Sequence, residues 1–396
     1  MKLYYKNKQD ATTLLETTKA AVLTPVDRQF ETPNKIIKGD NLEVMQALLL
    51  DFNLRAKIDL VYIDPPFATK TIFKHNKSRT STVSSSHKDD IAYSDILVGA
   101  EYLEFLRERL IFIRELMADH ASIYLHIDYK VGHYVKVIMD EIFGQKNFRN
   151  DITRIKCNPK NFQRKGYSNV KDLILFYTKT DDFIWNEPRA DISKEDIKRL
   201  FPKIDEKGRR YTTTPLHAPG ETRNGNTGKS WKGLMPPKGR HWRYDPAVLG
   251  QLNSEGLIEW SSTGNPRKII YADDAEANGK RIQDIWEFKD SPYPSYPTEK
   301  NLDLLNLIIQ TSSNPGQFVF DCFCGSGTTL FAAHQLHRYW IGIDNSDIAI
   351  QTTYRRFTPA EDALFDRDIP YNYFEQQVLS VSKIGFDASK HHLASR

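Results

Sequence analysis

The sequence predicts an α/β fold with a mostly parallel sheet, interrupted by an inserted domain. Two observations lead to this class. Short apolar runs alternate with amphipathic stretches along most of the 396 residues, the pattern of proteins in which strands and helices follow one another. Between about residues 180 and 285 this alternation gives way to turn-rich sequence, after which it resumes. The length is sufficient for a core that carries a sizeable insertion.

The first half of the core is expected over residues 34–179, after an N-terminal extension over 1–33. Residues 68–100 are rich in Ser, Thr, Lys and Asp and lack apolar periodicity, which predicts a long mobile loop. The expected elements are a strand at 36–37, a helix over 42–50, a strand over 58–63, a helix over 101–117, a strand over 122–127, a helix over 131–143 and strands near 151–155 and 173–178.

The second half of the core is expected over residues 286–378. It should contain a helix over 302–311, a buried strand over 318–321, a helix over 328–336 and a strand over 340–344. The polar tail over 379–396, which includes Lys390-His391-His392, is expected to fray.

Composition excludes several classes of protein. No apolar run approaches the roughly 18–20 residues that a membrane helix needs. The N-terminus lacks the apolar segment of a signal peptide, so we expect a cytoplasmic protein. The three cysteines, at 157, 322 and 324, make neither a disulfide framework nor the paired spacing of a zinc site, and no metal is expected. Cys322 and Cys324 are predicted to be small buried residues.

The charge is unevenly distributed. Residues 154–243 hold 21 Lys and Arg against 10 Asp and Glu, whereas the whole chain has a net charge of only +4. Five of the six tryptophans lie in or just after this segment. A basic segment in an otherwise acidic protein favours a nucleic-acid contact surface, although solvated basic faces are also common.

A first motif joins a strand, a glycine turn and a helix start at residues 321–329, and Asp344 ends the next strand. Glycines let the backbone approach a ligand, and an acid about 20 positions later can accept both ribose hydroxyls of a nucleoside. The motif lacks the Gly-Lys-Ser/Thr of a phosphate loop, and Leu330 stands where a dinucleotide fold has a small residue. A glycine turn without a ligand is the alternative. The expected cofactor-side residues are Asp321, Phe323, Gly325, Gly327, Thr328 and Asp344.

A second motif, Asp64-Pro65-Pro66-Phe67, follows the strand over 58–63, at the strand end where ligand chemistry occurs in open α/β sheets. It offers a carboxylate, a rigid backbone carbonyl and an aromatic ring, but no strong nucleophile. Hydrogen bonds from an exocyclic amine to Asp64 and the Pro65 carbonyl would aim the nitrogen lone pair at an electrophile. Phe67 can stack on an extruded base. By itself the tetrapeptide is also compatible with an ordinary turn.

Together the two motifs resemble those of the DNA amino-methyltransferases of restriction-modification systems, in the permuted β class that includes type III modification subunits. The catalytic tetrapeptide precedes the cofactor glycines, as in that class. Further matches extend over most of residues 34–357, among them Gly39-Asp40 and the segment from Tyr296 to Lys300. Departures from the commoner family forms are Tyr296 for His, Asn301 for Pro and Phe67 for Tyr.

The resemblance implies a permuted Rossmann-like methyltransferase fold, with a mostly parallel twisted sheet, helices on both faces and an inserted target-recognition domain. The implied cofactor is S-adenosyl-L-methionine. By resemblance, Asp40 contacts its adenine, Asp344 its ribose, residues Phe323 to Gly327 its methionine part, and Thr298 and Lys300 its carboxylate. The implied partner is double-stranded DNA, and a homodimer and a partner restriction subunit stay open.

The expected activity is methyl transfer to adenine N6 after base flipping, as in adenine-specific DNA methyltransferases (EC 2.1.1.72). Cytosine N4 methylation is the main alternative; family members of that kind more often carry Ser in place of Asp64. A catalytically inactive DNA-binding protein is the second alternative. A nicotinamide dehydrogenase is disfavoured by Leu330 and by the basic insertion. His126 is expected to lie near the pocket without transferring protons.

The insertion over 180–285 is expected to select the target sequence. Arg240 and Arg243 are candidate base readers, because the guanidinium fork matches guanine O6 and N7. Trp242 between them is the third expected DNA contact. A basic solvated lobe is the alternative interpretation.

Overall fold

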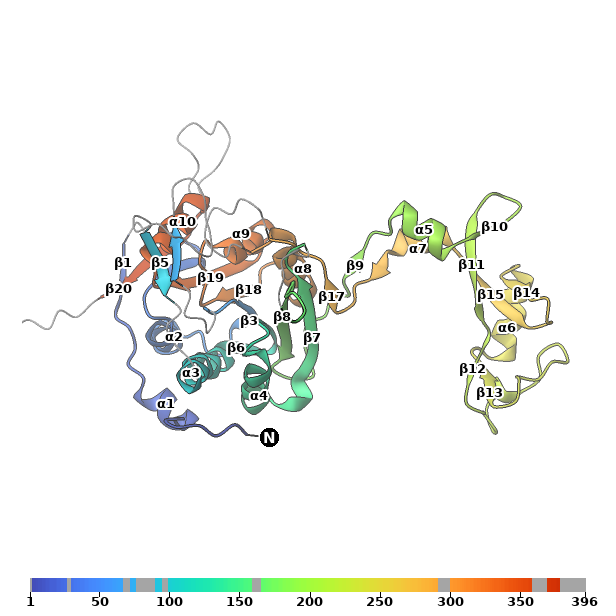
Figure 1. The fold of residues 1–396 in the computed structure, drawn as a ribbon, viewed down its shortest axis with the longest axis horizontal. Coiled ribbons are helices and arrows are strands. Elements are labelled where there is room, and N and C mark those ends of the chain that lie inside the picture. The colour runs from blue at the N-terminus through green and yellow to red at the C-terminus, as the bar shows by residue number, and fades with distance from the viewer. Residues whose placement is uncertain are drawn as a thin grey trace, which may run out of the picture. The chain divides into compact units, whose positions relative to one another are not determined.

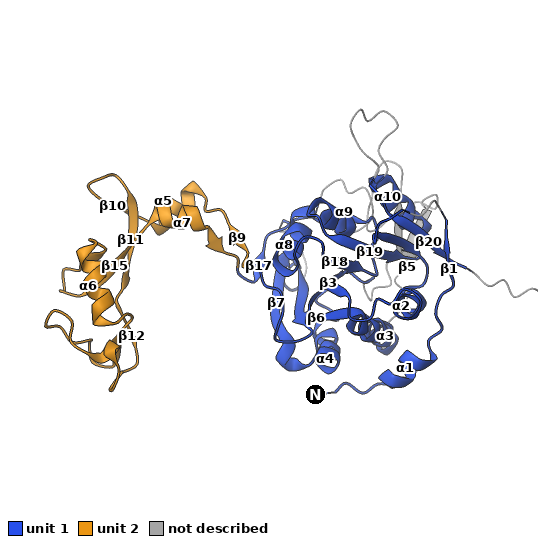
Figure 2. Ribbon diagram, turned by 180° about the vertical axis from the view of Figure 1, so that it is seen from behind, with its two compact units in different colours: residues 1–186, 283–396 blue, residues 187–282 orange. Residues whose placement is uncertain are grey.

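The chain forms two compact units in the computed structural model (Figure 2). One comprises Met1–Asn186 and Gln283–Arg396, and the other is Glu187–Ile282, inside the 180–285 segment that the sequence sets apart. The structure describes residues 2–26, 30–66, 72–75, 90–94, 99–158, 165–290, 300–357 and 369–377.

The first unit is built on a ten-stranded sheet. Its central strands run parallel, whereas β8 is antiparallel to both of its neighbours and β1 is antiparallel to β20. In spatial order the strands are β1 (Leu23–Pro25), β20 (Asn372–Gln376), β2 (Lys35–Lys38), β19 (Tyr339–Asp344), β18 (Phe318–Asp321), β3 (Ile58–Ile63), β6 (Met117–Ile127), β8 (Lys171–Thr178), β7 (Phe148–Ile155) and β17 (Ile285–Trp286).

The sheet order is that of a permuted chain. Strands β18 and β19, from the C-terminal half, lie between β2 and β3 of the N-terminal half, and all four are parallel. The N-terminal half therefore cannot complete the sheet by itself. This arrangement agrees with the predicted permuted, Rossmann-like class.

Helices cover both faces of this sheet, with α2, α3 and α4 on one side and α8, α9 and α10 on the other (Figures 1 and 2). The buried side chains of α2, α3 and α4 join those of the strands in one large apolar core. The helices of the unit are α1 (Ala11–Thr17), α2 (Asn41–Leu50), α3 (Ala100–Leu116), α4 (Gly132–Phe143), the 3-10 turn η1 (Gln145–Asn147), α8 (Leu302–Ser312), α9 (Thr328–Gln335) and α10 (Asp347–Phe357).

Most predicted elements of the core agree with the structure to within a residue or two, but some elements were not predicted. Strand β6 begins five residues before its predicted start, and the edge strands β1 and β17, together with β20 next to β1, were missed. Within the segment predicted as a loop, β4 (Ile72–His75) and β5 (Asp90–Ser94) pair antiparallel. The predicted tail over 379–396 lies outside the described residues.

The second unit contains small antiparallel sheets and short helices, with two small apolar cores. Its four-stranded sheet has the order β10 (Lys203–Ile204), β11 (Arg210–Pro215), β15 (Pro266–Tyr271), β14 (Ile258–Trp260). The other elements are β9 (Arg189–Ala190) with β16 (Lys280–Arg281), β12 (His217–Pro219) with β13 (Arg240–Trp242), α5 (Lys194–Leu200), η2 (Asn226–Gly228), α6 (Pro246–Ser254) and α7 (Ala272–Asn278). In the part of the chain that the structure describes, no helix combines the length and apolarity needed to cross a membrane.

Candidate active site

Four aspartates follow four neighbouring parallel strands of the sheet. Asp64 comes directly after β3, Asp321 ends β18, Asp344 ends β19, and Asp40 lies two residues beyond β2. Because these strands are adjacent and parallel, their carboxyl ends share one edge of the sheet. The structure thus brings the two predicted motifs, far apart in the sequence, to a single edge.

The two carboxylate oxygens of Asp64 have different environments. Oδ2 lies 2.8 Å from the Lys300 ammonium, and both side chains are largely buried. Oδ1 is buried and accepts no hydrogen bond from any residue that the structure describes. A buried, unpaired carboxylate oxygen costs free energy, so it is expected to be satisfied by a ligand. The sequence predicts a role for Lys300 toward the cofactor, whereas its ion pair with Asp64 was not predicted.

A buried hydrogen-bonded chain supports the strand that carries Asp64. The Tyr62 hydroxyl, two residues earlier on β3, lies 2.9 Å from His126 Nδ1 on β6, and His126 Nε2 lies 3.4 Å from Asp172 Oδ2 on β8. Burial raises the pKa of Tyr62, so the phenol stays protonated and donates to Nδ1. Burial, assisted by Lys300, lowers the pKa of His126, which is therefore neutral. The chain ties three strands together beneath the site.

Beyond Asp172, the hydrogen-bonded chain continues to basic side chains that were not predicted as site residues. Lys156 pairs with Asp172 at 2.6 Å, and the fully buried Arg154 donates to the Phe288 carbonyl at 2.8 Å and pairs with Asp290. These contacts fix residues 288–290, shortly before Lys300 in the sequence. The sequence signal was the presence of Arg154 and Asp172 next to apolar residues of β7 and β8.

The glycine loop after β18 is held by Asp344. Its Oδ2 accepts from the Gly325 amide at 2.9 Å, and its Oδ1 accepts from the Ser346 amide at 2.9 Å. Gly327 is left-handed, with φ 74° and ψ 19°, where it begins α9. Asp321 Oδ1 accepts from the Phe323 amide at 3.0 Å. Both acids of the motif therefore hold the loop in its conformation.

Close packing of α9 on β19 depends on a glycine in the strand. A Cβ at Gly342 would lie 2.4 Å from Leu330 Cδ1 and 3.1 Å from Cys324 Sγ. Dinucleotide folds achieve the same approach with a small residue in the helix. Here the helix has the large residue and the strand the small one. Cys322 and Cys324 are buried, as predicted.

Asp40 is positioned by a buried arginine. Its carboxylate caps α2 through the Leu42 amide at 2.9 Å and lies 3.4 Å from Arg109 on α3. Arg109 also donates to Asn41 Oδ1 at 2.6 Å, and Asn41 donates to the Cys322 carbonyl at 2.8 Å. Arg109 is only 5% exposed. Sequence analysis missed it, although an arginine within the apolar stripe of a helix was a usable signal.

The edge is electrostatically suited to a cation. Burial, together with the nearby carboxylates of Asp64 and Asp344, raises the pKa of Asp321 to about 7 against the opposing effect of its hydrogen bonds. Burial also raises the pKa of Asp344. A positively charged ligand would relieve this repulsion, whereas the pyrophosphate of a dinucleotide would increase it.

Three of the predicted site residues need separate comment. Phe67 and Thr298 lie outside the described residues. Trp242 was predicted to contact DNA, and this prediction is corrected by its burial. It is 1% exposed, packs against Trp231 and donates its indole hydrogen to the Lys229 carbonyl, so it is a core residue. Its neighbours Arg240 and Arg243 are exposed.

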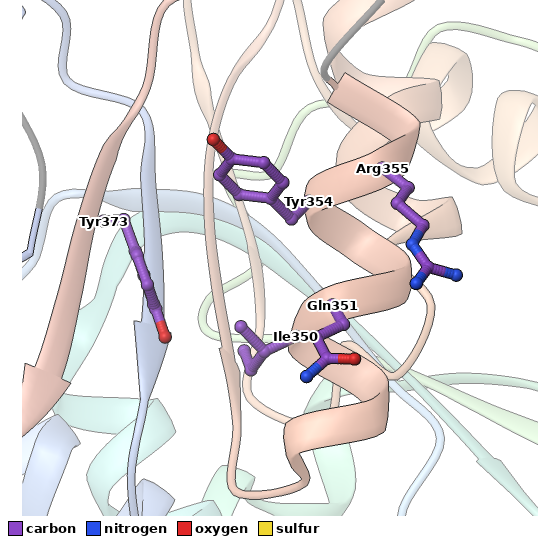
Figure 3. A pocket seen from close by; sticks show the side chains of 5 residues that line it. All are labelled: Ile350, Gln351, Tyr354, Arg355 and Tyr373. Carbon is purple, nitrogen blue, oxygen red and sulfur yellow. The ribbon is translucent and has the colours of Figure 1, made fainter. Parts of the chain in front are cut away.

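A shallow concavity lies between α10 and β20, where Ile350 and Tyr354 extend from the helix toward the strand that carries Tyr373 (Figure 3). Gln351 and Arg355 complete its lining. None of the predicted site residues lines it. It is therefore not part of the sheet edge that carries Asp40, Asp64, Asp321 and Asp344, which we call the carboxylate edge.

Comparison with known proteins identifies the family. A family model described as DNA methylase, of the N6/N4 type, matches residues 58–355. The type II methyltransferase M.EcaI of Enterobacter cloacae is 43% identical over 331 residues, which are 82% of this chain and 69% of that protein. The type III restriction-modification enzyme StyLTI Mod subunit of Salmonella typhimurium is 26% identical over 77% of this chain and 50% of its own length.

Among solved structures, the M1.HpyAVI–SAM complex covers 81% of this chain and 98% of its own, with 16% identity and a TM-score of 0.42. The family match spans both motifs and the strands between them. The chain therefore belongs to the N6/N4 DNA methylase family and is a DNA methyltransferase of the restriction-modification type.

Proposed function

We propose that the chain transfers a methyl group from S-adenosyl-L-methionine to adenine N6 of a base flipped out of double-stranded DNA, the activity EC 2.1.1.72. The observation that carries this proposal is the carboxylate of Asp64. Its Oδ2 is held by Lys300, and its buried Oδ1 has no partner among the described residues. An amino group with hydrogens to donate is the ligand that such an atom requires.

Catalysis then depends on positioning. Oδ1 of Asp64 accepts one hydrogen of the base amino group and the Pro65 carbonyl accepts the other, so that the nitrogen lone pair is directed at the electrophile. Lys300 fixes the carboxylate rotamer and keeps Oδ2 occupied, which leaves a single oxygen for the base. Phe67 stacks on the flipped base. Oδ1 is also the acceptor for the proton that the amino group gives up.

The residues of the edge fit S-adenosylmethionine, because its sulfonium and ammonium groups are cations and the edge carries several carboxylates, among them the buried Asp321. When bound, the cofactor supplies an electrophilic methyl group. Asp344 and the Phe323–Gly327 loop hold its ribose and methionine parts, with Asp321 and Thr328 beside them, and Asp40 holds its adenine. Thr298 and Lys300 would bind its carboxylate.

The second unit selects the target sequence. It presents Arg240 and Arg243 at its surface, and residues 210–243 hold seven Lys or Arg against one acidic residue. Positive charge binds phosphates of any sequence, and exposed arginines read guanine edges. A homodimer and a partner restriction subunit are further proposals, the latter motivated by the relative named as a Mod subunit.

The modified base is identified by expressing the protein in cells that lack DNA methylation. Nucleosides from the digested DNA are separated by mass spectrometry, and sequencing of methylated sites maps the target. N6-methyladenine at one recurring sequence is the expected product. N4-methylcytosine would establish the first alternative, and unmodified DNA with retained DNA binding would establish the second.

Asp64→Asn tests the mechanism, because it removes the charge and replaces one acceptor with a donor while keeping the shape. We expect methyl transfer to fall by about 10²- to 10⁴-fold, with cofactor affinity by calorimetry nearly unchanged. The matched control is Asp347→Asn, which breaks another aspartate–lysine pair, 2.6 Å long with Lys38, at an exposed position. Full turnover by Asp64→Asn would remove this carboxylate from the mechanism.

A further inference from the structure

A tight turn lies in the segment between β12 and β13 of the second unit. Trp231 and Leu234 exchange two backbone hydrogen bonds of 2.9 Å, which leaves Lys232 and Gly233 as the two central residues. Both have positive φ, 50° and 77°, as a type I′ turn requires. Such turns are short and stiff, so the residues at the turn are presented in one conformation.

The base of this turn is anchored in the unit's core. Trp231 is 5% exposed and packs with Trp242 and Leu216. Its ring also stacks on Trp260 with centroids 5.8 Å apart and planes within 1°. The turn therefore cannot move without disturbing the largest side chains of the core. Its conformation is prepared before any partner binds.

Two apolar side chains follow the turn and lie at the surface. Leu234 is 38% exposed and Met235 is 63% exposed. The next residues, Pro236 and Pro237, have fixed φ and limit the freedom of the chain beyond them. Leu234 and Met235 are thus two consecutive exposed apolar residues beside a turn of fixed conformation, and we call this pair the Leu234–Met235 wedge.

The surroundings of this wedge distinguish between classes of partner. Residues 210–243 hold seven Lys or Arg and one acidic residue, and Lys232, Lys238 and Arg240 lie within six residues of the wedge. Lysine is depleted at the centres of protein interfaces. Lysine and arginine are the main phosphate contacts in DNA complexes, and Leu or Met wedges enter between base steps of the minor groove.

We infer that the Leu234–Met235 wedge inserts between base pairs of the target duplex and unstacks one step, while the adjacent lysines grip the flanking phosphates. This inference rests on the proposed DNA-recognition role of the second unit and adds to it a second distortion of the duplex besides the flipped base. The unstacking cost depends on sequence, so the wedge contributes to target choice without hydrogen bonds to bases.

The test uses a duplex of the mapped target site, with 2-aminopurine placed in turn at positions outside the methylated base. Met235→Gln keeps the side-chain length and makes it polar, whereas Met235→Leu keeps it apolar. Val248→Gln is the control, since Val248 is an apolar residue of the same unit that is 41% exposed on α6. Circular dichroism melting of each variant verifies that the unit is folded.

When wild type, Met235→Leu or Val248→Gln binds, 2-aminopurine fluorescence should rise at a single base step that does not contain the target base. Met235→Gln should lose that signal and bind the duplex about tenfold more weakly. Equal unstacking and affinity for Met235→Gln and wild type would overturn the wedge while leaving the methyltransferase assignment intact. Absence of both methylation and DNA binding by wild type would overturn both.

The wild-type protein could instead form a dimer in solution that Met235→Gln abolishes while DNA binding stays unchanged. This result would assign the wedge to contact with a second copy of the chain and would also overturn the inference.

Discussion

Gly327→Ala is the substitution whose cost can be worked out most directly from the structure. Gly327 begins α9 with φ 74°, and an added Cβ would lie 2.7 Å from Thr353 Cγ2 and 2.9 Å from Thr353 Oγ1. Thr353 is fully buried and donates to the Gly325 carbonyl at 2.9 Å. The methyl group thus strains the backbone and displaces a side chain that holds the glycine loop.

The two contributions add. A left-handed non-glycine residue costs about 1–2 kcal/mol, and overpacking a tight site costs about 1–3 kcal/mol more. We expect the free energy of unfolding to fall by about 2–5 kcal/mol. Gly316→Ala is a matched control, because Gly316 has φ 80° and an added Cβ would meet nothing within 4 Å. It should lose only the backbone part, about 1–2 kcal/mol.

Urea unfolding followed by far-UV circular dichroism measures both variants. Thr353→Ala in the Gly327→Ala background removes the obstructing atoms, so the double variant should lose less stability than the sum of the two single changes. Equal losses for Gly327→Ala and Gly316→Ala, or strict additivity with Thr353→Ala, would refute the steric argument.

Three other expectations concern the carboxylate edge and the second unit. The raised pKa of Asp321, about 7, means that the folded free protein binds more protons than the unfolded chain between about pH 4 and pH 7, so this group lowers the free energy of unfolding as pH rises through that range. A cationic cofactor favours the ionised form of Asp321, so the affinity for the cofactor, measured by calorimetry, should rise about tenfold from about pH 6 to about pH 8. Asp321→Asn should make this affinity nearly independent of pH. A wild-type affinity that does not change with pH would contradict the expectation. Gly342→Ala should destabilise by about 1–3 kcal/mol, and Leu330→Ala should offset part of that loss in a double-mutant cycle; no coupling would show that the two residues do not compete for space. Trp242→Ala should destabilise the second unit by about 3–5 kcal/mol, which selective urea unfolding of that unit would measure; a stable, DNA-deficient variant would restore Trp242 as a contact residue.

The interior strands were predictable because they are buried on both faces. All six residues of β3 are buried, and the apolar run that this requires is visible in the sequence. The edge strands were not predictable for the opposite reason. β17 has two residues, and β1 has three that are half-buried or exposed, so neither shows a period. Their pairing is decided by neighbours distant in the sequence.

The site was predictable where chemistry is local and not where it depends on tertiary contacts. The positions of Asp64, Asp321 and Asp344 follow from strand ends, which motifs locate. The Lys300–Asp64 ion pair joins residues from the two halves of the core, which are far apart in the sequence, and no local sequence pattern predicts it. Trp242 was misassigned because β13 has three residues. So short a strand cannot show which of its side chains faces inward.

The permuted sheet order has a consequence for synthesis of the protein on the ribosome. β3 pairs with β18 through Leu60 and Val319, so its partner is translated only after more than half of the chain has followed. At about 5–20 residues per second the delay is on the order of tens of seconds. During that time one side of an apolar strand lacks its neighbour and is exposed to association with other chains. The nascent chain is therefore inactive and most vulnerable to aggregation until its last quarter emerges. A lower growth temperature or a larger supply of chaperones should raise the yield of active enzyme.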